Sequence, residues 1–139
     1  MLNKTMFIGR LTRDPELKTV GSGKSVTTFG LALNRKYKDA QGDLQEDVTF
    51  IDIVCWDKLA ENVAKYQTKG KRVYVEGRLQ IDAVDGEDGR KKYFTKIVAH
   101  TVLFLDNRED SERAKPVYGD NVPYKGDNVP YKGNEEVPF

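Results

Sequence analysis

Residues 6–105 contain several short runs that are rich in apolar and β-branched residues or alternate between apolar and polar residues, and one short segment in the middle changes to helical spacing. Alternation places successive side chains on opposite faces of a strand. It therefore predicts five strands, over residues 6–11, 26–34, 48–56, 72–82 and 92–105. Residues 58–68 instead carry Leu59, Val63 and Tyr66 at helical spacing, and Lys69-Gly70-Lys71 closes the helix. The pattern predicts an all-β domain that contains one helix.

The order of the elements narrows the architecture further. Three strands, one helix and two more strands favour a small closed antiparallel barrel. The five-stranded Greek-key barrel known as the OB-fold has this order, with the helix between the third and fourth strands. Other small barrels fit the periodicity as well. Residues 20–24 and 85–89 are expected to be turns, and the polar residues 35–47 a long, exposed hairpin connection.

The strand over residues 48–56 is the most informative. Ile51, Ile53 and Cys55 share one face and can pack into a core, whereas Phe50 and Trp56 lie on the other face. Large aromatic side chains are costly to leave in water, so they usually meet a partner. Nucleic-acid bases are good candidates, because base stacking contributes about 1–3 kcal/mol per base. Packing under a loop or at a subunit interface is the alternative that this pattern leaves open.

The apolar pattern stops after residue 106. Residues 107–139 contain four of the five prolines. They also repeat one motif in varied form: Tyr118-Gly-Asp-Asn-Val-Pro123, Tyr124-Lys-Gly-Asp-Asn-Val-Pro130 and Tyr131-Lys-Gly-Asn-Glu-Glu-Val-Pro138-Phe139. Such a segment has too few apolar side chains to offset the entropy of ordering. We expect a folded domain over residues 1–106 and a disordered tail over 107–139. The domain has a net charge of +3 and the tail of −2, which is weak evidence for a polyanionic partner.

Enzyme signatures are missing from the sequence. The single histidine, His100, lies mid-strand, and the single cysteine, Cys55, has the core parity of its strand. No zinc-ligand spacing, phosphate loop or paired-carboxylate motif is present. We therefore expect a protein that is not an enzyme and uses no metal and no cofactor. No apolar run approaches the ~18 residues of a membrane span, and the lone cysteine suits a reducing cytoplasm.

Three segments carry a family resemblance. They are Phe7-Ile-Gly-Arg-Leu-Thr-Arg-Asp-Pro-Glu16, residues 50–62 with Cys55-Trp56-Asp57-Lys58-Leu59-Ala60-Glu61, and Val75-Glu76-Gly77-Arg78-Leu79. Together with Pro138-Phe139 behind acidic residues, they closely resemble the bacterial single-stranded DNA-binding protein family. The resemblance implies an OB-fold, a homotetramer, and sequence-independent binding of single-stranded DNA in replication, recombination and repair, in a cytoplasmic, nucleoid-associated setting. One alternative is a protein adaptor on the same barrel, in which Phe50 and Trp56 form an interface. Another is an RNA-binding barrel, because stacking does not distinguish ribose from deoxyribose.

The resemblance also implies individual roles. The stacking aromatics of the family fall on Tyr37, Phe50 and Trp56, and a fourth falls on Val84, which has no ring. Asp52 and Asp82 stand where family members often carry positive charge, which would weaken or redirect the DNA path. The expected phosphate contacts are Arg10, Arg13, Lys18, Arg35, Lys38, Lys58, Lys69 and Arg78.

The last five residues suggest a protein-docking segment. The resemblance assigns partner binding, to replication and repair proteins, to Glu135, Glu136, Val137, Pro138 and Phe139. A terminal Phe offers a ring and a carboxylate to one basic-rimmed apolar pocket, Pro138 lowers the ordering cost, and the glutamates attract basic partners. Residues 120–124 and 127–131 resemble this segment. They are either weak secondary docking sites or a duplicated spacer.

Overall fold

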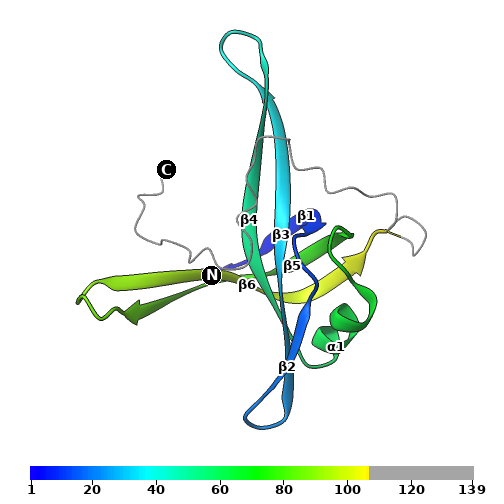
Figure 1. The fold of residues 1–139 in the computed structure, drawn as a ribbon, viewed down its shortest axis with the longest axis vertical. Coiled ribbons are helices and arrows are strands. Elements are labelled where there is room, and N and C mark those ends of the chain that lie inside the picture. Colours follow the sequence, from blue (N-terminus) through cyan, green and yellow to red (C-terminus); the bar gives the residue numbers. More distant parts are fainter. Residues whose placement is uncertain (107–139) are drawn as a thin grey trace.

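The computed structural model describes residues 1–106, coloured in Figure 1. In chain order the elements are β1 (Thr5–Leu11), β2 (Glu16–Val20), β3 (Lys24–Lys38), β4 (Leu44–Trp56), α1 (Asp57–Tyr66), β5 (Arg72–Asp85) and β6 (Lys91–Phe104). The predicted tail, its repeats and its acidic end lie outside the described residues.

Five of the strands close into a barrel. Their hydrogen-bonded order is β1-β5-β6-β4-β3, and β3 pairs with β1 through Arg10–Ala32 and Leu11–Leu31 to complete the ring. In chain order these strands are β1, β3, β4, β5 and β6, and the helix lies between the third and the fourth of them. The predicted OB-fold is therefore confirmed. One pairing differs from the expected antiparallel barrel, because β4 and β6 run parallel. A closed ring with an odd number of strands cannot alternate direction throughout, so at least one parallel pairing is unavoidable.

Alternation along the strands builds the core as expected. Phe29, Leu31, Ile53, Val73 and Val75 are fully buried inside the barrel. Cys55 is also fully buried, and Ile51 packs against the same cluster, so the predicted inward face of β4 is confirmed. These side chains leave the opposite face of β4 directed away from the core.

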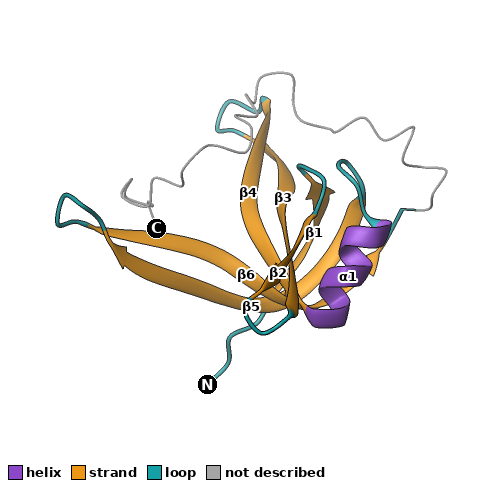
Figure 2. Cartoon of the chain, turned by 60° about the horizontal axis from the view of Figure 1, so that its bottom comes forward, coloured by secondary structure: helices purple, strands orange, loops and turns teal. Residues whose placement is uncertain are grey.

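Helix α1 covers one end of the barrel (Figure 2). Its buried residues are Ala60 and Val63, and the hydroxyl of the buried Thr27 donates a 2.8 Å hydrogen bond to the Ala60 carbonyl. Asp57 has a φ of 56°, in the left-handed region that Asp tolerates better than most residues. The chain therefore turns sharply from strand into helix immediately after Trp56.

The sequence reasoning missed two features of the strands. Strand β2, which pairs with β3 from Glu16–Thr28 to Val20–Lys24, is exposed at every residue and so shows no alternation of burial. Residues 35–47 were expected to be a connection, but β3 and β4 stay paired out to Lys38–Leu44. We call this projecting ribbon (residues 34–48) the first arm, and the ribbon of β5 and β6 (residues 80–96) the second arm. Figure 1 shows the arms projecting in different directions.

The first arm is polar because solvent covers it on both sides, which explains why its strand character is hidden in the sequence. At the tip of the first arm the Asp39 carboxylate accepts hydrogen bonds from the backbone N–H groups of Gln41 and Asp43. The Asp43 contact is the main reason that the pKa of Asp39 is lowered.

Within residues 1–106, no helix is long and apolar enough to cross a membrane.

Candidate nucleic-acid interface

Two large aromatic side chains of β4 lie on the outside of the barrel. Phe50 is 42% exposed and Trp56 is 40% exposed, as their parity predicts. Val54 shares their face but is only 8% exposed, because it sits between Thr28 of β3 and Val98 of β6. Phe50 and Trp56 therefore stand at the two ends of the outer face of β4, with the buried Val54 between them.

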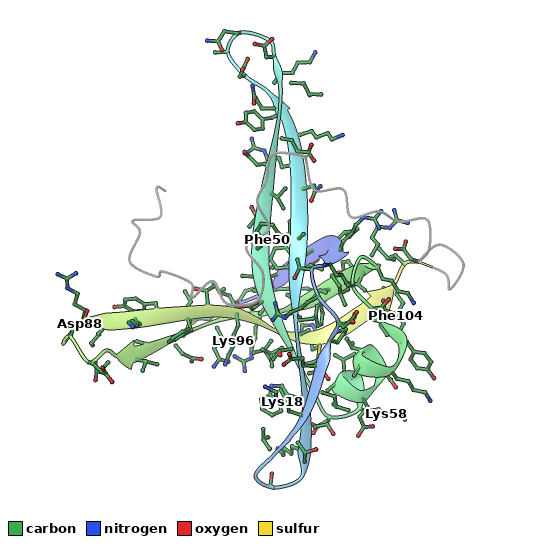
Figure 3. All side chains as sticks on the ribbon, viewed as in Figure 1. Lys18, Phe50, Lys58, Asp88, Lys96 and Phe104 are labelled. Atoms are coloured by element: carbon green, nitrogen blue, oxygen red, sulfur yellow. The ribbon has the colours of Figure 1, made fainter. Side chains whose placement is uncertain are left out.

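Strand register brings cations to this surface from other elements. Lys18 pairs with Val26, which pairs with Trp56, so all three side chains share one row. Lys96 of β6 pairs with Asp52, between the two aromatic residues. We call this surface the aromatic face; its members are Arg13, Lys18, Phe50, Asp52, Trp56, Arg78, Phe94 and Lys96. Figure 3 shows Phe50 where the first arm leaves the barrel and Lys96 at the root of the second arm.

The two acidic residues singled out in the sequence each hold one of these cations. Asp52 contacts the guanidinium of Arg13 at 3.5 Å, and Asp82 contacts the ammonium of Lys96 at 3.1 Å. Hydrogen bonds from Gln80 and then from Lys96 lower the pKa of Asp82. The Asp82 carboxylate therefore stays ionised near neutral pH. A polyanion on this face competes with Asp52 for Arg13 and with Asp82 for Lys96.

Three of the predicted contact residues lie on the first arm. Tyr37 is half-buried, and the Arg35 guanidinium lies 4.9 Å from the centre of its ring. Ala32 pairs with Phe50, and Tyr37 is an odd number of residues further along β3, so it lies on the opposite face of the ribbon. Lys38 is exposed at the end of β3. A nucleic-acid strand that contacts both Phe50 and Tyr37 has to pass around an edge of the first arm.

Two other predicted phosphate contacts lie near the loop after α1. The Arg10 guanidinium donates to the Gly70 carbonyl at 3.0 Å and lies 3.6 Å from the buried carboxylate of Asp106. The Lys69 backbone N–H donates to Asp14 at 2.8 Å. These contacts engage Arg10 with the loop after α1 and with Asp106 after β6. Of the remaining predicted residues, Lys58 is exposed two residues after Trp56, and Arg78 is exposed in register with Val98.

The sequence reasoning missed Phe94 and Lys96 on β6. Ile97 and Ala99 of this strand are buried, so the opposite parity, which includes Lys92, Phe94 and Lys96, faces outward. Phe94 is 46% exposed. The alternation was present in the sequence and would have identified these residues if β6 had been divided into faces as β4 was.

Cys55 and His100, whose side chains could in principle react, lie in surroundings that do not activate them. Burial raises the pKa of the Cys55 thiol to about 12, so the thiol stays protonated and unreactive. His100 is exposed, and its Nε2 lies 3.2 Å from the Glu76 carboxylate. Among residues 1–106, no three His, Cys, Asp or Glu side chains gather as metal ligands do.

A second exposed surface lies on the outside of β1, β5 and β6. Ile8 pairs with Tyr74, which pairs with Leu103, and Met6 occupies the next row with Glu76. Met6, Ile8 and Leu103 are 61%, 62% and 53% exposed. Glu76 accepts hydrogen bonds from Lys4 and Tyr74 at 2.8 Å each, and the contacts with Lys4, Tyr74 and His100 lower its pKa to about 2. This surface is apolar with one ionised carboxylate whose partners are already in place.

Comparisons with known proteins agree on one family. The model of the Single-strand binding protein family matches residues 2–105. A single-stranded DNA-binding protein of Staphylococcus aureus is 43% identical over 122 residues, which cover 88% of this chain and 77% of the relative. Single-stranded DNA-binding protein 3 of Listeria innocua is 44% identical over 110 residues, 79% of this chain and 68% of the relative.

A solved structure has the same fold. The Plasmodium falciparum SSB in complex with ssDNA superimposes with a TM-score of 0.71 at 34% identity. The superposition covers 76% of this chain and 96% of that one.

Proposed function

The chain belongs to the single-strand binding protein family, and from this premise we propose that it binds single-stranded DNA without regard to sequence. It is a binding protein and not an enzyme. The observation that carries the proposal is the aromatic face, where Phe50 and Trp56 stay exposed among cations from four other segments of the chain.

The chemistry of this face suits a single strand better than a duplex. Every base has a π-face, so exposed rings stack on unpaired bases of any sequence, whereas the bases of a duplex are already stacked on each other. Lys18, Arg13 and Lys96 supply positive charge beside the rings and attract the backbone phosphates. Neither interaction reads the edges of the bases, which explains why the binding is independent of sequence.

Competition between nucleic acids tests the choice of ligand. Unlabelled DNA, RNA and duplex DNA of equal length are titrated against the protein bound to a labelled oligo-dT. We expect the DNA single strand to displace the probe best and the duplex to displace it least. Equal displacement by the duplex would show that the aromatic rings do not take part, and better displacement by RNA would redirect the proposal to RNA.

We also propose that the protein is a homotetramer that buries the second exposed surface. Monomeric soluble proteins rarely leave contiguous apolar patches in water, and Met6, Ile8 and Leu103 lie together on β1 and β6.

Replacing Ile8 with aspartate tests this assembly. A charge buried without a partner is strongly unfavourable, so Ile8→Asp lowers the native mass of the protein to that of dimers or monomers. Leu44→Asp is the control, because Leu44 is 69% exposed at the distant end of the first arm. Native mass spectrometry gives the result. Tetramers of Ile8→Asp as stable as those of Leu44→Asp would place the interface elsewhere.

We further propose that residues 135–139 recruit replication and repair proteins while the barrel holds DNA, in the cytoplasm and on the nucleoid. The support is chemical: two glutamates precede a Val-Pro-Phe sequence, which combines attraction to basic partners with an apolar anchor. The charge of this segment has the sign of DNA, so it does not add to DNA affinity.

Deletion of residues 135–139 separates the two activities. The truncated protein keeps its affinity for oligo-dT and loses the capture of replication and repair proteins from a bacterial lysate, measured by quantitative mass spectrometry against the full chain. A chain with residues 135–139 in scrambled order controls for composition and charge. Undiminished capture by the truncated chain would move partner binding to another part of the protein.

A further inference from the structure

The two faces of the second arm differ in chemistry. On the face that continues the barrel interior, Leu79, Ile81, Ala83 and Tyr93 form a mostly apolar surface. The opposite face carries Arg78, Gln80, Asp82 and Val84 of β5 beside Lys92, Phe94 and Lys96 of β6. This opposite face therefore has three cations, one carboxylate and one aromatic ring.

Phe94 is the only ring on that face of the second arm, and it is 46% exposed. Phe94 pairs with Asp82, and the Val84–Lys92 pair is next along the ribbon, so lysines flank the ring two residues away on either side. Phe94, Val84 and Lys92 line one side of a shallow pocket of about 480 Å³ that extends to the turn at residues 85–88. The ring is therefore accessible along the ribbon and on its pocket side.

The face of Phe94 is continuous with that of Phe50. Lys96 pairs with Asp52 in the parallel ladder, and Phe94 and Phe50 each come two residues before these partners. The ladder ends at this pair, because the two arms diverge beyond it (Figure 1). A strand is displaced about 3.3 Å per residue, so each ring lies about 7 Å along its own strand from the shared Asp52–Lys96 row. The two rings stand at the roots of the two arms.

We propose that Phe94 is a base-stacking platform that takes one nucleobase of a bound single strand as the strand passes from β4 onto the second arm. Lys92 and Lys96 attract the phosphates on either side of that base. The proposal rests on the proposed function. Phe94 would supply the second arm with the aromatic ring that Val84 lacks.

The charges on the arm favour DNA over a second protein copy as the occupant of this face. Its single carboxylate, Asp82, is already paired with Lys96 at 3.1 Å and with Gln80 at 2.9 Å. Asp82 offsets only Lys96, so Arg78 and Lys92 leave this face with a net positive charge, whereas the apolar groups suited to protein contact lie on the other face. Asp85, Glu87 and Asp88 at the turn carry the opposite charge and set the limit of the DNA path before the tip.

The test compares Phe94→Ala with Tyr93→Ala, because Tyr93 is 42% exposed and lies next in sequence on the opposite face. Dissociation constants are measured by fluorescence anisotropy with labelled oligo-dT of increasing length, alongside native mass. Removal of one stacking platform weakens binding by about fivefold or more. We expect this loss for Phe94→Ala on oligomers long enough to reach the second arm and an unchanged affinity on the shortest ones. Phe94→Trp keeps the wild-type affinity.

Photocrosslinking provides an independent readout. Oligomers that carry 5-iododeoxyuridine crosslink to stacked rings, and we expect a modified peptide that contains Phe94. Equal affinities of Phe94→Ala and the wild type at every length, with no adduct at Phe94, would overturn the proposal. A lowered native mass of Phe94→Ala with unchanged affinity per subunit would also overturn it and assign the ring to subunit contact. If the wild type itself fails to bind oligo-dT, the proposed function is what fails.

Discussion

Replacing Trp56 with alanine weakens binding of oligo-dT by about 10- to 100-fold and leaves the native mass of the protein unchanged. Trp56 is 40% exposed, ends β4 and lies in one row with Val26 and Lys18. The backbone on both sides of Trp56 is fixed, because Cys55 before it is buried and Asp57 after it begins α1 with a φ of 56°. A platform fixed in this way stacks on a base at little cost in side-chain entropy.

The control for Trp56→Ala is Tyr66→Ala. Tyr66 is a similarly exposed aromatic residue, at 50%, but it lies at the end of α1 and packs against Phe104. We expect its removal to leave the affinity for oligo-dT within twofold of the wild type, about 0.4 kcal/mol. Dissociation into monomers by Trp56→Ala, with unchanged affinity per subunit, would show that Trp56 belongs to a subunit interface.

Replacing Gly77 with valine prevents the barrel from closing. Gly77 lies at the irregularity in the β5–β6 ladder, where the register shifts between Glu76 and Gly77. A Cβ atom there would overlap the carbonyl oxygen of Val98 and come within 2.8 Å of the Ala99 Cα, and both atoms belong to the backbone of β6. Backbone in a closed ring cannot move aside locally, so we expect a loss of about 3 kcal/mol or more of unfolding free energy.

Ala83→Val is the matched substitution for Gly77→Val. Ala83 lies on the same strand but on the exposed part of the second arm, and changes at such sites stay within about 0.5 kcal/mol. Thermal unfolding followed by circular dichroism, at one fixed protein concentration, compares the two, with Gly77→Ala as a milder variant. Similar melting temperatures for Gly77→Ala, Gly77→Val and Ala83→Val would show that β5 and β6 do not approach as closely as described.

The barrel could be predicted well from the sequence because burial on one face of a strand or helix gives a regular spacing of apolar residues. Ile53 and Cys55 alternate with exposed residues on β4, and Val63 marks the buried side of the helix. Phe50 and Trp56 could be assigned to the outer face by the same parity. Their position in β4 does not identify what they contact. The expectation that they stack on DNA bases comes from the resemblance of the neighbouring residues to a known family.

The rest of the fold leaves no such pattern. Strand β2 and the first arm are solvated on both faces, so they look like loops in sequence although their backbones are paired. Pairing between strands is also invisible to periodicity. Only the register showed that Lys18 and Lys96 come to the aromatic face, and that Tyr37 is on the other side of its ribbon from Phe50.

The near-neutral net charge of the chain is compatible with a DNA-binding face, because acidic residues on that face are paired with some of its cations. The net charge is +1, yet two acidic residues on the aromatic face are engaged with Arg13 and Lys96. We therefore expect DNA phosphates to replace these carboxylates as partners of the two cations. For this reason we expect a weaker dependence of affinity on salt than a count of the cations on the face would give.

The central claim is that single-stranded DNA stacks on the aromatic face, and fluorescence of Trp56 tests it most directly because Trp56 is the single tryptophan of the chain. Titration with oligo-dT at two or more salt concentrations measures the binding. We predict strong quenching that salt reverses, with the logarithm of affinity falling by about 0.7 per phosphate neutralised for each unit of log salt concentration. Tight binding of oligo-dT with unchanged Trp56 fluorescence would contradict the account, because the DNA would then occupy a different surface.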